Sequence, residues 1–240
     1  MRRISFILIA LLVLGACATK PLPPQKTLPS AHNWRNNIMN VVFIYNTNED
    51  GEILNSGTGF VIDKAGLILT VNHLFTHPDT DKTFVKIRTD KGFVIKKAAI
   101  KSRLAGCDLA LLQVDYGFKS QVLVREFNLE TGEYAYTIGY PPGTDLILTD
   151  SENIKFSRGN FYMNIYNHQI LTGNNITVDM RLFNMAIAPG ASGSPIFDKN
   201  GNAVGVLGLN APLKFVGSVF TWGVPIKYWK TLLLLDLLKE

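Results

Sequence analysis

The sequence is poor in cysteine and histidine, with only two cysteines and four histidines among its 240 residues. The two thiols, Cys17 and Cys107, can form one disulfide at most, and none if either is modified. Cysteines, histidines and carboxylates form no clustered metal-binding motif, which argues against a zinc site. We therefore expect neither a metal ion nor another cofactor.

Charged residues are also scarce, at 18% of the chain, while hydrophobic residues make up 47%. This balance is typical of a folded protein with a sizeable core, arranged as one domain of two subdomains or as two small domains. The formal net charge of +5 is diffuse, and no stripe of lysine and arginine is interleaved with aromatic residues. The composition therefore argues against nucleic acid as a partner. The sequence predicts no particular oligomeric state.

The N-terminus, "MRRISFILIALLVLGAC", has two arginines, an apolar run over residues 4–14 and two small residues before Cys17. This layout predicts a secretory signal peptide over residues 1–16, because the apolar run is short for a permanent membrane helix. A membrane anchor helix that is kept in place is the alternative.

The residues "LGAC" resemble the lipobox of bacterial lipoproteins. The resemblance implies cleavage before Cys17 and lipidation of its thiol, which would anchor the protein in the cell envelope, outside the cytoplasm. Ala18 differs from the aspartate that retains many lipoproteins in the inner membrane, so we expect the periplasmic side of the outer membrane in a host with two membranes. Cys107 is then a lone thiol, expected to be a small buried side chain and not a nucleophile.

A proline-rich stretch follows the lipobox. "ATKPLPPQKTLPS" carries four prolines and little apolar periodicity, which predicts an extended tether over residues 17–33. The folded domain is expected over residues 34–240.

The rest of the chain is dominated by short segments rich in β-branched and aromatic residues, bounded by glycine, asparagine, aspartate or proline. Helices do not alternate with these segments, so we expect an all-β barrel or sandwich and not an α/β-hydrolase fold. An Asn-Gly pair in "DKNGNA" predicts a hairpin. The expected strands are residues 40–46, 57–63, 66–75, 83–90, 92–100, 108–115, 134–140, 154–167, 176–184, 203–210 and 218–224. One helix is expected over about residues 225–238, with an apolar side formed by Trp229, Leu232, Leu233, Leu235 and Leu238.

Three residues are candidates for chemistry, and each has a structural alternative. Ser192 lies in "APGASGSPIF", where it is either a nucleophile at a backbone turn or a polar residue of a tight loop. His73 closes an apolar strand and is either a base or a satisfied core histidine. Asp108 opens "DLALLQV" and either orients a histidine or caps a turn.

The order His73, Asp108, Ser192 is that of one of the three common serine hydrolase arrangements. "TVNH", "DLALLQV" and "GASGSP" resemble the signature stretches of the chymotrypsin-like serine peptidases, in particular the HtrA/Deg and glutamyl-endopeptidase branches. "GTGFVID", "YTIGYPPG" and "GVPI" add to the resemblance. It implies two six-stranded antiparallel β-barrels, over about residues 38–115 and 130–224, with the site between them.

The resemblance also implies roles for the three residues. Ser192 would be the nucleophile, His73 the general base and then acid, and Asp108 the carboxylate that orients His73. The backbone N–H groups of Gly190 and Ser192 would form an oxyanion hole. The expected function is a lipid-anchored serine endopeptidase that hydrolyses protein or peptide substrates through an acyl-enzyme. The alternative is a catalytically silent binding module of the same fold at the cell envelope.

In this family the specificity pocket lies beside two stretches, "NMAIA" and "VLGLN" in this chain. Neither stretch holds a carboxylate for a substrate lysine or arginine. Ile187 and Leu207 stand where glutamyl endopeptidases carry threonine and histidine. We therefore expect cleavage after small or medium apolar residues. The pocket residues implied are Ala186, Ile187, Leu207, Gly208 and Leu209.

Overall fold

The computed structural model describes residues 31–126, 129–140, 155–169, 177–185, 187, 190–208, 213–215 and 218–238. The predicted signal peptide, Cys17 and the residues of the predicted tether before 31 lie outside this part, as do Ala186 and Leu209. Over the described ranges, no helix combines the length and hydropathy needed to span a bilayer.

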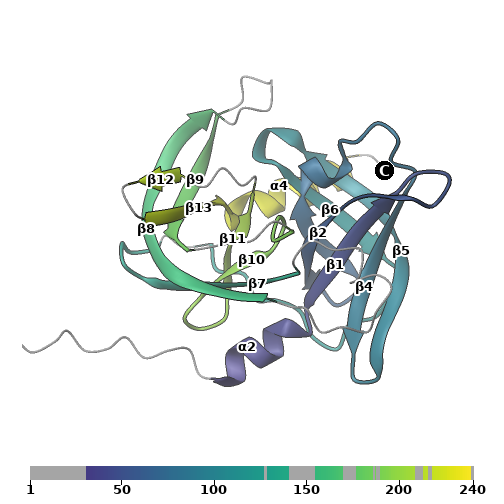
Figure 1. Ribbon diagram of the computed structural model, residues 1–240, viewed down its shortest axis with the longest axis horizontal. Helices are drawn as coiled ribbons and strands as arrows, with labels where there is room; N and C mark the ends of the chain where they lie inside the picture. Colours follow the sequence, from purple (N-terminus) through teal and green to yellow (C-terminus); the bar gives the residue numbers. More distant parts are fainter. Residues whose placement is uncertain are drawn as a thin grey trace, which may run out of the picture.

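Two β-barrels lie side by side, and the first is drawn in purple to teal in Figure 1. Its six strands are antiparallel and close in the order β1-β2-β3-β6-β5-β4. Short turns join β2 to β3 and β4 to β5, and Gly66 and Gly92 adopt positive φ there, as the turn glycines in the sequence predict. The strands are β1 (Val41–Thr47), β2 (Ile53–Asp63), β3 (Leu67–Val71), β4 (Lys82–Thr89), β5 (Gly92–Leu104) and β6 (Leu109–Val114).

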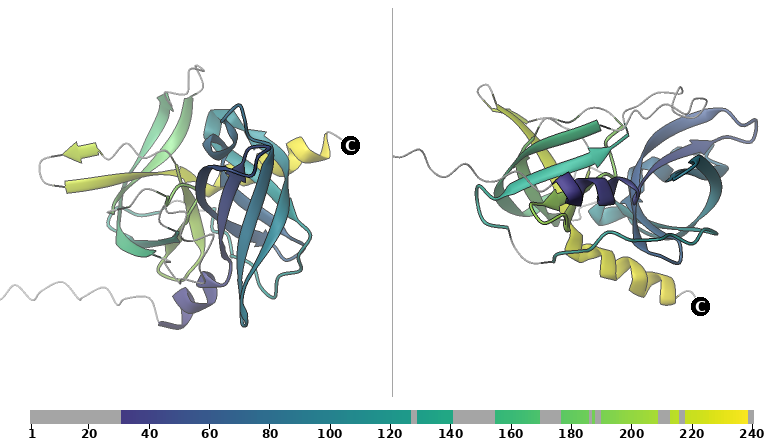
Figure 2. Two further views of the ribbon diagram at one scale, coloured as in Figure 1. Left: turned by 45° about the vertical axis from the view of Figure 1, so that its right-hand side comes forward. Right: turned by 90° about the horizontal axis from the view of Figure 1, so that it is seen from below.

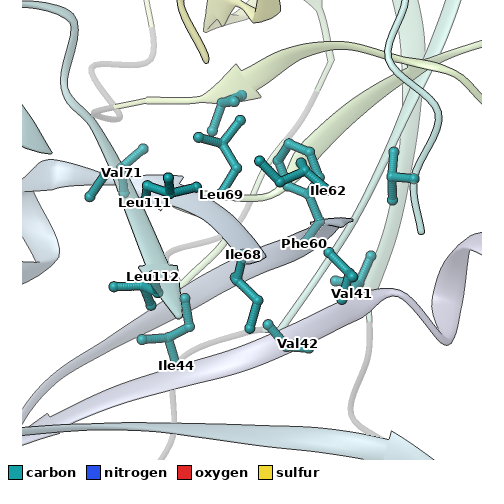
Figure 3. Packing of buried hydrophobic residues seen from close by; sticks show 14 of the residues in the cluster. Val41, Val42, Ile44, Phe60, Ile62, Ile68, Leu69, Val71, Leu111 and Leu112 are labelled. Carbon is teal, nitrogen blue, oxygen red and sulfur yellow. The ribbon is translucent and has the colours of Figure 1, made fainter. Parts of the chain in front are cut away.

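Branched aliphatic and aromatic side chains fill the first barrel (Figure 3). Ile44, Phe60, Ile68 and Leu111 are fully buried in this cluster. Every residue of β1 is buried, and its five apolar residues, Val41 to Tyr45, all belong to this cluster. Phe43 meets Tyr140 of the second barrel edge to face, with ring centroids 5.7 Å apart. One apolar cluster therefore extends from the first barrel into the second, which also holds a smaller cluster of its own around Phe161 and Phe183.

The second barrel closes in the order β11-β10-β7-β8-β9-β13, with β11 pairing back onto β13 and β12 added beside β13. The predicted all-β fold of two six-stranded antiparallel barrels is thus confirmed. The predicted Asn-Gly hairpin joins β10 to β11, with Gly201 at φ +85°. The strands are β7 (Tyr134–Gly139), β8 (Lys155–Gln169), β9 (Thr177–Asn184), β10 (Pro195–Asp198), β11 (Ala203–Leu207), β12 (Leu213–Phe215) and β13 (Ser218–Pro225).

Each of two helices packs against the barrel to which it is not directly joined in sequence (Figure 2). Helix α2 (Ala31–Ile38) precedes the first barrel but docks on the second, where Asn37 Nδ2 donates to the Gly201 carbonyl at 2.9 Å. Helix α4 (Trp229–Leu237) follows the second barrel but packs on β5 and β6 of the first. There the Ser102 hydroxyl donates to the Leu232 carbonyl at 2.8 Å.

The helices differ from the sequence-based expectation in two ways. Helix α2 was not predicted and begins inside the predicted tether. The C-terminal helix is present, preceded by the 3₁₀ turn η3 (Ile226–Tyr228), but its expected apolar side is incomplete. Leu232 is fully buried, whereas Leu238 is 83% exposed, because the helix ends one residue before it and leaves the barrel surface.

Candidate active site

His73 lies on a 3₁₀ turn, η1 (Asn72–Phe75), that begins where β3 ends. The turn is fixed from both sides. The Asn72 N–H donates to the Asp108 carbonyl at 3.0 Å, and the Asn72 side-chain oxygen accepts from Arg103 Nε at 2.6 Å. The His73 side chain keeps 25% of its surface exposed, so the imidazole is held in place yet reachable from solvent. It is not a core histidine.

Asp108 occupies an uncommon backbone conformation just before β6. Its φ is +52°, in the left-handed region, and it is the one described residue other than glycine with positive φ. Aspartate tolerates this region better than most residues, yet the conformation still costs on the order of 1 kcal/mol. Packing beneath η1 holds it there, because Asp108 is 3% exposed and its backbone is bonded to Asn72 and Ala105.

The carboxylate of Asp108 binds His73 twice. One oxygen accepts from the His73 backbone N–H at 2.8 Å, and the other lies 2.8 Å from His73 Nδ1. An ionised carboxylate can only accept, so Nδ1 carries the ring proton and Nε2 keeps its lone pair when the imidazole is neutral. The arrangement leaves Nε2 as an acceptor for a proton and places a negative charge where it stabilises an imidazolium.

Ser192 lies in a tight turn before β10, and this turn is pressed against the first barrel. Gly190 and Gly193 have φ of +81° and +86°. A Cβ at Gly193 would lie 2.0 Å from the Thr58 carbonyl oxygen, so only glycine allows this approach. The Ser192 carbonyl accepts from the Thr58 N–H at 2.8 Å. Gly190 and Gly193 therefore provide the positive φ angles that the turn requires.

Gly57 of β2 lies between the serine turn and the histidine turn. A Cβ at this position would meet Leu74, the residue after His73, at 2.7 Å, and the Ser192 carbonyl oxygen at 3.0 Å. The Ser192 turn of the second barrel and the turn that carries His73 therefore both approach Gly57. His73 and Asp108 are joined by hydrogen bonds, and the turn that carries Ser192 lies close to the turn that carries His73, where the two barrels meet.

The predicted pocket residues are only partly described. Ile187 is half-buried and packs against the smaller hydrophobic cluster of the second barrel, formed by Leu129, Ala135, Phe161, Phe183, Met185, Ile196, Val204 and Leu207. Leu207 is fully buried, and its carbonyl accepts from the Gly193 N–H at 2.8 Å, which ties β11 to the serine turn. Gly208 is buried beside it.

Cys107 is adjacent to Asp108 in sequence but has no features of a nucleophile. Its side chain is 6% exposed, and burial, with a smaller contribution from Asp179, raises the pKa of the thiol to about 11. The thiolate population at neutral pH is therefore very small.

Several residues that build the site were not identified from the sequence. Thr58 and Thr70 join β2, β3 and the serine turn through hydrogen bonds, and Arg103 supports Asn72. The glycines around Thr58 in "SGTGF" were a signal for close backbone approach. Nothing in the sequence pattern singles out Arg103, because its partner Asn72 is 31 residues away in the sequence.

Two six-stranded barrels with a His–Asp pair on one and a serine turn on the other define the chymotrypsin-like class of fold. Solved structures agree. The chain superposes on the Rv3671c protease of M. tuberculosis in its active form with a TM-score of 0.68, at 20% identity, covering 90% of this chain and 92% of that one. For Deg5 the TM-score is 0.66 at 21% identity, covering 88% and 95% of the two chains.

A model of the trypsin-like peptidase domain matches residues 57–206, and the chain therefore belongs to this family. A probable periplasmic serine endoprotease DegP-like of Pseudomonas putida (strain W619) is 30% identical over 155 residues, 62% of this chain and 28% of that protein. The mitochondrial serine protease HTRA2 of Drosophila pseudoobscura pseudoobscura is 28% identical over 179 residues, 74% of this chain and 38% of that protein. The chain thus spans less than two fifths of the length of these relatives.

Proposed function

We propose that the protein is a serine endopeptidase of the HtrA/Deg type, with Ser192, His73 and Asp108 as its catalytic triad. The two hydrogen bonds of the Asp108 carboxylate, one with the backbone N–H of His73 and one with its ring Nδ1, carry the proposal. This contact fixes one tautomer and leaves the basic nitrogen available, which a structural histidine does not need. The similarity to a DegP-like serine endoprotease and to the serine protease HTRA2 gives independent support.

In the proposed reaction Ser192 Oγ attacks the carbonyl carbon of the scissile peptide bond while His73 Nε2 takes the hydroxyl proton. The imidazolium, stabilised by Asp108, passes this proton to the leaving amine as the C–N bond breaks. Water then attacks the acyl-enzyme, giving one proton to His73, and Ser192 recovers that proton as the acid product leaves. The N–H groups of Gly190 and Ser192 stabilise the oxyanion formed in each half-reaction.

Reaction with a fluorophosphonate probe tests the nucleophile directly. We expect the native protein to be labelled on Ser192, because His73 increases the nucleophilicity of that hydroxyl alone. Ser192→Ala should remove the label. Ser194→Ala is the matched control, since this buried serine two residues away loses only a hydroxyl that has no hydrogen-bond partner in the described structure. A folded native protein that resists the probe would instead indicate a catalytically silent binding module.

We further propose that the enzyme is anchored in the cell envelope by lipid on Cys17, outside the cytoplasm and on the periplasmic side of the outer membrane where the host has two membranes. The "LGAC" stretch supports the anchor, and the periplasmic location in the names of the DegP-like relatives supports the compartment. Several acyl chains, each contributing roughly 0.8 kcal/mol per buried CH₂, would make the attachment long-lived.

The same probe locates the protein after cell fractionation. The labelled wild type should sediment with membranes, whereas Cys17→Ser should be released or remain an unprocessed precursor while its folded domain stays reactive. If labelled Cys17→Ser remained acylated and membrane-bound, another residue would have to carry the anchor.

For specificity we propose that residues such as Val, Ala, Leu or Ile precede the cleaved bond. Leu207 and Ile187 belong to an apolar cluster, and a charged substrate side chain without a counter-charge would cost several kcal/mol on burial. A small or medium apolar side chain would gain about 1.5–3 kcal/mol. Cleavage of a peptide library is the measurement. Dominant cleavage after Glu, Lys or Arg would contradict the proposal.

A further inference from the structure

Thr58 of β2 uses its polar groups to connect both barrels with the serine turn. The residue is fully buried. Its N–H donates to the Ser192 carbonyl at 2.8 Å, and its carbonyl accepts from the Thr70 hydroxyl at 2.7 Å. Its own hydroxyl oxygen lies 3.1 Å from the Gly190 carbonyl and 3.0 Å from the Tyr140 nitrogen.

The direction of the Thr58 hydroxyl proton follows from its two neighbours. The Tyr140 N–H can only donate, so the hydroxyl oxygen is the acceptor of that bond. The Gly190 carbonyl can only accept, so the single hydroxyl proton is directed to it. Tyr140 follows directly on β7, hence a strand end of the second barrel orients a hydroxyl of the first.

The two carbonyls that Thr58 binds flank the Ser192 N–H, and one of them belongs to Gly190, whose N–H is the other proposed oxyanion donor. The Gly190 carbonyl belongs to the peptide unit that follows the Gly190 N–H, and the Ser192 carbonyl to the unit that follows the Ser192 N–H. Two planar peptide units are thereby fixed, and the unit between them carries the Ser192 N–H. Gly190 has a positive φ and no Cβ to restrict rotation of its backbone, so hydrogen bonds from outside the turn are needed to fix its conformation.

We propose that Thr58 is a positioning residue whose hydroxyl holds the serine turn with the Gly190 and Ser192 N–H groups aimed at the oxyanion. The inference rests on the proposed peptidase function. It assigns to β2 a role in transition-state stabilisation, because an oxyanion hole is effective only when its donors are oriented before the reaction. The hydroxyl acts through Gly190 and does not touch the substrate.

Thr58→Val is the decisive variant, since valine keeps the shape of threonine and removes the hydroxyl. Loss of one oxyanion donor lowers kcat by about 10²–10³-fold, and a misoriented turn should lose part of this, about 10–100-fold. We expect KM to change less than about twofold, because the interaction lost is one made in the transition state. The affinity for a peptide aldehyde, which forms a tetrahedral adduct with Ser192, should fall in parallel with kcat.

Two further variants separate positioning from folding. Thr58→Ser keeps the hydroxyl and should restore kcat to within about threefold of the wild type. Thr137→Val is the matched control, because Thr137 is a buried threonine whose hydroxyl donates to the Pro195 carbonyl at 2.8 Å, beyond the serine turn. It should lower the melting temperature as Thr58→Val does, with kcat unchanged.

The outcomes distinguish this inference from the function on which it rests. Equal kcat for Thr58→Val and wild type, or equal losses in Thr58→Val and Thr137→Val, would overturn the positioning role while leaving the peptidase intact. A folded Thr58→Ser with a hundredfold loss would also overturn it, and this variant serves if valine prevents folding. A wild type that neither hydrolyses peptides nor reacts with a fluorophosphonate would overturn the peptidase function, and the positioning role with it.

Discussion

Replacement of Ser192 by alanine should lower kcat for peptide hydrolysis by about 10⁴–10⁶-fold. The variant loses the oxygen that forms the acyl-enzyme, so only the oxyanion donors and substrate binding remain to assist attack by water. The fold should be unaffected, because the bond that the Ser192 carbonyl accepts from Thr58 uses the backbone and persists with alanine. Initial-rate kinetics with a chromogenic peptide and a thermal melt measure the two effects.

The outcome that contradicts this assignment is specific. Near-native turnover by Ser192→Ala, with a preparation free of contaminating protease, would exclude Ser192 as the nucleophile. A melting temperature lowered by many degrees would instead show that the Ser192 side chain stabilises the turn, although the described structure shows no hydrogen bond from this side chain.

Replacement of Asp108 by asparagine should lower kcat by about 10⁴-fold. Asparagine also tolerates the left-handed backbone at φ +52°, so the turn before β6 should keep its shape. Its amide, however, can donate to His73 Nδ1 and so favours the tautomer with the proton on Nε2, which cannot accept the serine proton. The imidazolium also loses its buried counter-charge. The pH-rate profile and kcat at neutral pH measure the loss.

Asp63→Asn is the matched control for this variant. Asp63 ends β2, and its carboxylate accepts from the Ala65 N–H at 2.8 Å in the turn to β3. Asparagine caps such turns as well, so kcat should be unchanged. If Asp108→Asn behaved like Asp63→Asn, the Asp108 carboxylate would be a turn cap and not part of the catalytic machinery.

The sequence predicts strands well wherever β-branched and aromatic residues lie between turn residues. All eleven expected segments contain a strand, since β-branched and aromatic residues bounded by turn residues favour an extended conformation locally. β10 was not among the expected strands, because it has only four residues and directly follows the serine turn. It pairs locally with β11 through the predicted Asn-Gly hairpin, whereas its pairing with β7 is long-range. Helix α2 was missed for a similar reason, since "AHNWRNNI" has a weak apolar pattern and gains its place from the bonds of Asn37.

The candidate site is predictable in part. The residue types and order of His73, Asp108 and Ser192 are visible in the sequence, because the proposed chemistry needs those functional groups. The left-handed backbone of Asp108 and the hydrogen bonds of Thr58 are not visible, because they depend on distances between segments brought together by the two barrels. A sequence pattern shows which functional groups are present, whereas the hydrogen bonds that position these groups depend on the tertiary fold.

Because α2 and α4 each pack on the barrel to which they are not directly joined in sequence, unfolding of the two barrels should be cooperative. Helix α2 leads into the first barrel but is bonded to the second, and α4 leaves the second barrel but is bonded to the first. Neither barrel can unfold alone without exposing the apolar surface that the other barrel's helix covers, together with the shared core at Phe43 and Tyr140. The two barrels should therefore melt in a single transition, and a chain that has folded only one of them should expose enough apolar surface to become a target of other proteases.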